Sequence, residues 1–121
     1  MKVNYKNKVV AIANILLNDY AFDHKYTYHY GLIYPLEKID FVIENRESTS
    51  VVVFLEAKRY AIRMWFDFDE GTFRITRCKI EEGSCSIDDV GETEILPLHI
   101  KRFRKALDEE ISKLKEAYEI K

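Results

Sequence analysis

Hydrophobic residues recur at helical spacing near both ends of this chain and at alternate positions between those ends. From about Asn4 to Tyr20, apolar side chains return every three or four residues, which predicts an amphipathic helix. The apolar arc is widened by Val10, Ile15 and Leu17, so we expect this helix to be covered on more than one side. Its main stripe consists of Val9, Ile12, Ala13, Leu16 and Tyr20.

A second amphipathic helix is predicted from about Pro97 to Tyr118. Proline suits the first position of a helix, where its missing N–H has no partner to lose. Basic residues crowd the opening turns and include Arg102, Arg104 and Lys105. They either pair with acids one turn further along the helix or form a small basic patch for an acidic partner. The apolar stripe consists of Ile100, Phe103, Leu107, Ile111, Leu114 and Tyr118.

Two apolar runs in the middle of the chain predict strands. Lys38–Glu44 alternates, so we expect Ile39, Phe41 and Ile43 to face the core of the protein. Val51–Ala57 is rich in β-branched residues and has almost no alternation, which is typical of a strand buried on both sides. The polar residues 45–50 between the two runs are expected to form a hairpin loop.

The clearest alternation runs from Tyr60 to Ile75 and predicts a β-hairpin. A two-residue turn at Glu70-Gly71 would place Phe68 opposite Phe73. The acidic, glycine-containing residues 81–91 that come after it are expected to form a loop. The core face of the hairpin is predicted to contain Ile62, Met64, Phe66, Phe68, Phe73 and Ile75.

The opposite face of this hairpin combines charge with one tryptophan. In the predicted register Asp67 lies across from Arg74 as an opposite-charge pair. Either Trp65 is half-covered by arginine stems in cation–π contacts, or it is the centre of a binding surface. The residues of this face are Arg59, Arg63, Trp65, Asp67, Arg74 and Thr76.

Tyrosines are concentrated between residues 22 and 34. In an extended strand, Tyr26, Tyr28 and Tyr30 would place three rings on one face. One interpretation is an edge strand whose rings pack on the sheet while their hydroxyls reach water. The other is a recognition surface, because exposed tyrosine offers a large contact area at low entropic cost.

Composition and charge narrow the class of protein. The chain has 121 residues, of which 47% are hydrophobic and 33% charged, which is typical of one globular domain covering residues 1–121. A net charge of −2 argues against a general polyanion binder. With no secretory leader or membrane span in the sequence, we expect a soluble, cytoplasmic protein in which Cys78 and Cys85 are free thiols. A zinc site that adds His24 or His29 to these cysteines lacks the usual tight spacing, so no metal is expected.

These patterns predict an α+β fold in which an N-terminal helix, a four- to five-stranded antiparallel meander and a C-terminal amphipathic helix succeed one another. Both helices are expected on one face of the sheet. The broad arc of the first helix and the tyrosine segment also make a homodimer an expected arrangement.

One set of residues has the pattern of a catalytic centre. Asp40 lies in one predicted strand, and Glu56 and Lys58 close the next. Two carboxylates at the ends of paired strands can share Mg²⁺, which activates water, and a lysine two residues further can orient it. In this pattern residues 9–60 resemble the PD-(D/E)XK nucleases, in particular the N-terminal domain of type I restriction subunits. The resemblance implies a magnesium-dependent nuclease that uses these three residues.

The hypothesis we favour is a non-enzymatic protein that binds a protein partner and occludes it, without a cofactor. A phage or mobile-element inhibitor of a host defence complex would act in this way, as would an immunity or adaptor protein. Its surface would consist of Arg59, Arg63, Trp65 and Arg74, with Tyr26, Tyr28 and Tyr30 second. The alternatives are the nuclease and a weak nucleic-acid binder that uses Arg102, Arg104 and Lys105 with Arg63 and Arg74.

Overall fold

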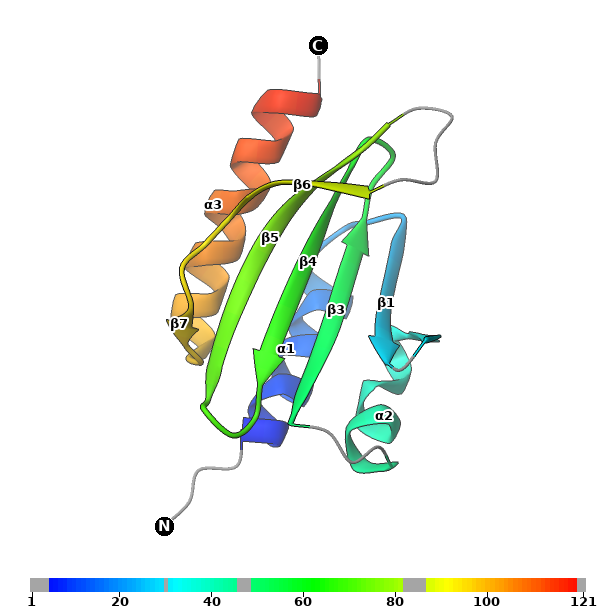
Figure 1. Cartoon of the computed structure of the whole chain (residues 1–121), viewed down its shortest axis with the longest axis vertical. Coiled ribbons are helices and arrows are strands. Elements are labelled where there is room, and N and C mark those ends of the chain that lie inside the picture. Colours follow the sequence, from blue (N-terminus) through cyan, green and yellow to red (C-terminus); the bar gives the residue numbers. More distant parts are fainter. Residues whose placement is uncertain (1–4, 30, 46–48, 82–86, 120–121) are drawn as a thin grey trace.

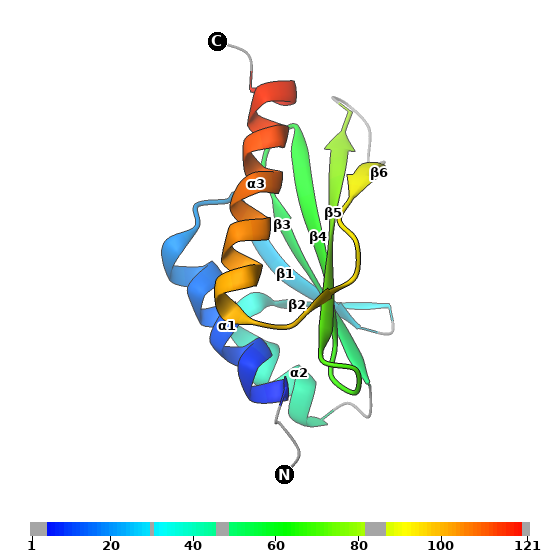
Figure 2. The same cartoon turned by 90° about the vertical axis from the view of Figure 1, so that its left-hand side faces the viewer.

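An antiparallel sheet carries the helices on one of its faces (Figures 1 and 2). On the other face, which we call the bare face, β6 curls in front of β5 and β4, and no other described element covers it. The computed structural model describes residues 5–29, 31–45, 49–81 and 87–119. The strands have the order β2-β1-β3-β4-β5-β6, and β7 pairs with the start of β5. The α+β prediction is confirmed, with more strands than the four or five expected. The elements are α1 (Tyr5–Asp19), β1 (His24–His29), β2 (Leu32–Pro35), the 3₁₀ turn η1 (Leu36–Lys38), α2 (Ile39–Asn45), β3 (Ser50–Glu56), β4 (Tyr60–Asp67), β5 (Thr72–Ile80), β6 (Ile87–Glu92), β7 (Leu96–Pro97) and α3 (Ile100–Tyr118).

Both terminal helices pack their predicted stripes against the core, but α1 ends before Tyr20 and α3 begins at Ile100 rather than at Pro97, which lies in β7. In α1 the residues Val9, Ile12, Ala13 and Leu16 are buried. In α3 the ring of Phe103 lies 5.6 Å from that of Phe66 and 5.4 Å from that of Phe73, centroid to centroid. Burying an aromatic side chain of this size contributes about 1.5–3 kcal/mol. Contacts of this kind attach α3 to the central strands β4 and β5.

The hairpin β4–β5 has the predicted faces but a different register. All six predicted core residues are buried. Phe66 pairs with Phe73 and Trp65 with Arg74, because the turn takes the four residues from Phe68 to Gly71. The carboxylate oxygen Oδ1 of Asp67 holds this turn by accepting hydrogen bonds, both 2.9 Å, from the N–H groups of residues 69 and 70. A shift of two residues in the pairing leaves every side chain on the same face of the sheet. The core residues were therefore predicted correctly, although the strand pairing was not.

The prediction of a strand at Lys38–Glu44 is wrong, because these residues form the end of η1 and most of α2. The buried positions are Ile39, Val42 and Ile43, at the three- and four-residue steps of a helix, whereas Phe41 is exposed. A stretch this short satisfies both periodicities, and packing against α1 decides between them. The predicted loop at residues 45–50 therefore joins a helix to β3, and its residues 46–48 lie outside the described part of the chain.

The tyrosine segment is not an edge strand, which corrects a second expectation. β1 lies between β2 and β3, and the chain reverses after it through Gly31 at a φ of +81°. This reversal returns Leu32–Pro35 along the outer side of β1 as the edge strand β2. Tyr30 lies outside the described residues.

A lysine on the helix side of β1 closes the C-terminus of α1. The ammonium group of Lys25 donates to the carbonyl oxygens of Leu16 at 2.8 Å and Leu17 at 3.2 Å, and also to that of Tyr20. Carbonyl groups at the C-terminal end of a helix lack some of their intrahelical partners, and a cation is favourable at this end of the helix dipole. The contact fixes α1 against the sheet.

A buried carboxylate links α3 to β5. The side chain of Glu110 is only 4% exposed, and its Oε1 lies 3.3 Å from Nε of Arg77 and its Oε2 3.1 Å from Nζ of Lys113. Gly91, opposite Arg77 on β6, leaves space for the guanidinium, which a side chain at that position would overlap. None of the helices in the described ranges has both the length and the apolar character needed to cross a bilayer.

Arg77→Leu is expected to lower the free energy of unfolding by about 2–4 kcal/mol, because it leaves the buried Glu110 carboxylate with one exposed partner. Arg104→Leu is the matched control. Its ion pair with Asp19 joins two side chains that are each 45% exposed, so the loss should stay within about 1 kcal/mol. Urea unfolding measures both. Equal losses in the two variants would contradict the role of Arg77. The double variant Arg77→Leu/Glu110→Leu should recover part of the stability that Arg77→Leu loses.

Gly71→Ala is expected to be more destabilising than Gly31→Ala. Both glycines have positive φ, +67° and +81°, which costs an L-residue about 1–2 kcal/mol. A Cβ at Gly71 would also overlap the ring of Tyr5, whereas nothing lies within 4 Å of one at Gly31. Overpacking adds about 1–3 kcal/mol. Thermal unfolding of the two variants compares the costs, and equal losses would show that Tyr5 moves aside freely.

Candidate functional site

Residues from five strands form one continuous surface on the bare face of the sheet. Tyr28 of β1 lies opposite Ile33 of β2 on one side and Val52 of β3 on the other. Val52 in turn lies opposite Trp65 of β4, which pairs with Arg74 of β5. Cross-strand partners share a face, so these residues form a row about 19 Å long.

A second row lies beside the first. Tyr26 pairs with Phe54, Phe54 with Arg63, and Arg63 with Thr76. The rings of Tyr26 and Phe54 stack at 5.1 Å between centroids, with 13° between their planes. Trp65, from the surface predicted first, and Tyr26 and Tyr28, from the surface predicted second, therefore belong to the same face.

Strand β3 joins the two predicted surfaces, and sequence reasoning missed it. Val51, Val53 and Leu55 are buried under the helices, while Val52 and Phe54 are half-buried on the bare face. The prediction that β3 is covered on both sides is therefore wrong. The strand is apolar along its whole length because one of its faces packs in the core and the other forms part of this surface.

The centre of the surface is apolar and accessible. Tyr28 is 46% exposed, Trp65 44% and Ile33 65%. Beside Trp65 lies a small hollow of about 110 Å³, lined also by Asp67, Thr72, Phe73, Arg74 and Ile95. Exposed apolar side chains that gather in one place are more informative than scattered ones, because large contiguous apolar patches are often interaction sites.

Ion pairs border this apolar centre on the β6 side. Arg63 lies 2.7 Å from Asp89, and Arg74 lies 3.7 Å from Glu92. The arginines therefore approach carboxylates of β6. Cation–π contacts in the described part of the chain are made by two lysines of α1, rather than by an arginine over Trp65.

Towards β1, a hydrogen bond between two side chains lies at the border of the surface. The hydroxyl of Tyr26 donates to Oε1 of Glu56 at 2.8 Å. Burial and, after it, the nearby carboxylate raise the pKa of Tyr26 above its ordinary value. Glu56 therefore acts as an acceptor that fixes an aromatic ring on the surface.

The three residues of the nuclease pattern lie in three different settings. Asp40 is in the first turn of α2, where its Oδ1 accepts a hydrogen bond from the N–H of Phe41 at 2.9 Å. Figure 1 shows α2 beside the beginning of β3, whereas Glu56 closes the far end of that strand. Lys58 is exposed in the turn after β3. Within the described residues, no three His, Cys, Asp or Glu side chains gather closely enough to hold a metal ion.

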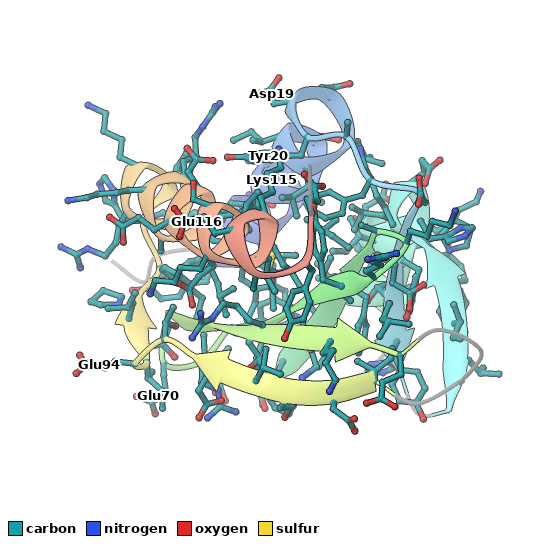
Figure 3. The ribbon with its side chains drawn as sticks, turned by 90° about the horizontal axis from the view of Figure 1, so that it is seen from above. Asp19, Tyr20, Glu70, Glu94, Lys115 and Glu116 are labelled. Atoms are coloured by element: carbon teal, nitrogen blue, oxygen red, sulfur yellow. The ribbon has the colours of Figure 1, made fainter. Side chains whose placement is uncertain are left out.

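The predicted basic residues do not form one patch. Arg102, Arg104 and Lys105 are exposed on α3, in the helix layer, on the opposite side of the sheet from Arg63 and Arg74. Arg104 also pairs with Asp19 at 3.2 Å, and Figure 3 shows Asp19 in the helix layer.

Arg59 also lies apart from the residues with which it was grouped. It is in the turn before β4 and lines a hollow with Lys79 and Tyr118, near the C-terminal end of α3. Of the predicted primary surface, the structure therefore brings together Arg63, Trp65 and Arg74.

A larger hollow of about 730 Å³ lies between the ends of α1 and α3 and the turn after β3. Tyr20 in this hollow donates to Asp108 at 2.7 Å, and Tyr60 donates to Glu119 at 2.6 Å. Tyr20 and Lys115 both line this hollow, and Figure 3 shows them in the helix layer. Burial and then Asp108 raise the pKa of Tyr20 to about 12. Charges of both signs line the hollow, which therefore favours neither an anion nor a cation.

Cys78, His24 and His29 have three different settings. Cys78 is a free, buried thiol, and burial raises its pKa to about 11, which makes it unreactive at neutral pH. His24 is exposed at the start of β1, and His29 is buried on the helix side. Cys85 lies outside the described residues.

Comparisons with protein-family models, with curated proteins and with solved structures find no match to this chain. The candidate site therefore depends on its geometry and chemistry alone.

Tyr26→Phe is expected to lower the free energy of unfolding by about 0.5–1.5 kcal/mol at neutral pH, because it removes the bond to Glu56. The pKa of Tyr26 is raised in the folded state, so its stabilisation is complete below the unfolded value of 10.0 and is lost as the pH rises above it. The difference between wild type and variant should therefore shrink in alkali. Urea unfolding at a series of pH values measures it. At neutral pH Tyr28→Phe should match wild type, and a pH-independent difference would contradict the assignment.

Proposed function

We propose that this protein is a non-enzymatic binding module whose bare sheet face docks on a protein partner and occludes part of that partner's surface. The observation that supports the proposal is the row from Ile33 through Tyr28, Val52 and Trp65 to Arg74. Its centre is apolar and its border is charged, which is the usual anatomy of a protein–protein interface. Tyrosine, tryptophan and arginine are also the residue types that dominate binding energy in such interfaces.

The preorganisation of the surface supports the same conclusion. Its aromatic rings stand on paired strands, and one is fixed further by the stack of Tyr26 on Phe54 and by Glu56. Little conformational entropy is then lost when a partner binds. A surface preorganised in this way suits a binder that blocks another protein, because occlusion requires only coverage.

Charge favours a protein over a nucleic acid as the partner. Proteins that stack bases on aromatic rings combine those rings with cations that track the phosphate backbone. Here Arg63 and Arg74 lie close to Asp89 and Glu92, and Glu56 adds a third carboxylate to the same face. A phage or mobile-element inhibitor of a defence complex, an immunity protein and an adaptor would all use such a surface, and the partner's identity distinguishes them.

Trp65→Ala is expected to abolish capture of the partner while leaving the fold intact. The wild-type protein is immobilised, exposed to a nuclease-treated lysate of its native host, and the captured protein is identified and purified. Calorimetry with that protein should show binding weakened about 30-fold or more by Trp65→Ala, as expected of a central aromatic anchor. Circular dichroism confirms folding of the variant.

Phe41→Ala provides the matched control, because Phe41 is a comparably exposed aromatic residue on α2 rather than on the bare face. It should bind as wild type does. If Trp65→Ala and Tyr28→Ala both retain full affinity, the binding surface lies elsewhere. If capture requires nucleic acid, or if the purified protein binds single-stranded RNA or DNA with an affinity that falls steeply with salt, a nucleic acid is the partner instead.

A further inference from the structure

The two edges of the sheet differ sharply in charge. The edge strand β2 contains only Leu32, Ile33, Tyr34 and Pro35, none of which is charged. Both Leu32 and Ile33 are largely exposed. The opposite edge strand, β6, exposes three carboxylates, which belong to Asp88, Asp89 and Glu92.

This difference matters because an edge strand presents unpaired N–H and C=O groups to which another strand can add. Proteins commonly block such edges with charged side chains. Two copies of β6 placed side by side would bring like charges together, so the acidic edge disfavours self-association. β2 carries no charged side chain, and the edge protections it has are its short length and Pro35 at its end. An open depression of about 810 Å³, lined partly by Ile33, Pro35 and Tyr26, borders it.

Pro35 determines which backbone groups of β2 point away from the sheet. It lies opposite Tyr26 and has no N–H, so these two residues cannot form a fully hydrogen-bonded pair. In an antiparallel ladder, hydrogen-bonded and non-hydrogen-bonded pairs alternate. The hydrogen-bonded pairs are then Thr27 with Tyr34 and His29 with Leu32, and the N–H and C=O of Ile33 point outward.

We infer that β2 is a self-association edge, at which a second copy of this chain adds its own β2 antiparallel to the first. Ile33 would lie on the twofold axis opposite Ile33 of the partner subunit, with which it exchanges two backbone hydrogen bonds. Leu32 would then lie opposite Tyr34 of the partner subunit on the helix side. No charged side chains meet in this register, and the same patch serves both subunits, as a closed twofold dimer requires.

The twofold axis of this arrangement is perpendicular to the sheet. The sheets of the two subunits become one, and both bare faces lie on the same side of it. A dimeric or repeating partner could then be bound at two points, with the gain in avidity that simultaneous binding gives. The dimer itself does not depend on the proposed function, since its hydrogen bonds come from backbone groups at the edge of the sheet, and the Ile33 side chain is the one part of the binding row that it shares.

Sedimentation equilibrium of the purified chain tests the inference. Wild type should show a reversible, concentration-dependent monomer–dimer equilibrium. Ile33→Lys should weaken dimerisation at least about tenfold, because it places two ammonium groups opposite each other on the axis. Val90→Lys is the matched control, because Val90 is an exposed apolar residue, 42% accessible, on the other edge strand. It adds the same charge and should leave the dimer intact.

Two outcomes would overturn the inference: a wild-type chain that stays monomeric at every soluble concentration, or a dimer that Ile33→Lys leaves unchanged. If Ile33→Lys fails to fold by circular dichroism, amide hydrogen exchange of wild type decides the matter. The Ile33 amide should exchange more slowly as the concentration rises through the dimerisation range, and a constant rate refutes the β2 contact. Protection that appears only with a different protein bound would assign the edge to that protein, against self-association.

The same measurements separate the two proposals. Trp65→Ala should dimerise as wild type does, since Trp65 lies on β4, away from β2. Partner capture that fails while the dimer persists would refute the proposed function alone. Leu32→Lys, whose side chain lies on the helix side of β2 rather than in the row, should also weaken the dimer. Capture that persists in a monomeric Leu32→Lys variant would leave the proposed function in place.

Discussion

The helices pack on one face of the sheet only, and this one-sided burial determines most other features of the structure. Phe103 of α3 contacts Phe66 and Phe73, while α1 and α2 bury their apolar stripes in the same core. A strand in such a sheet places alternate residues in the core and on the opposite face. The exposed aromatic residues of the opposite face therefore have no role in the core, and the proposed binding surface would give them one.

The charged residues reinforce this division into two sides. On the helix side, Lys25 closes α1 and Arg77 neutralises the buried Glu110, so cations there stabilise the fold. On the bare face, Arg63 and Arg74 pair with carboxylates of β6 and leave the aromatic centre uncharged. Residue type alone does not distinguish these roles, because an arginine on β5 can serve either side according to its position.

Three predictions made from the sequence are wrong for physical reasons. Residues 38–44 satisfy both strand and helix periodicity, and contacts with α1, distant in the sequence, select the helix. The turn between β4 and β5 is longer than expected because the Asp67 side chain replaces a strand pair with local hydrogen bonds. The polar residues of β6 predict a loop, but pairing with β5 holds them as a strand. The sequence of a strand does not by itself show which other strand it pairs with.

The sequence by itself determined the α+β class, both long helices and the inward faces of β4 and β5, because these depend on periodicities repeated over many residues. It also singled out Trp65 and the tyrosines. Only the tertiary structure decided that these residues share one surface, since Val52 and Phe54 of β3 join them across strand pairs distant along the chain. The same holds for the separation of Asp40 from Glu56: local patterns specify faces, and long-range packing specifies neighbours.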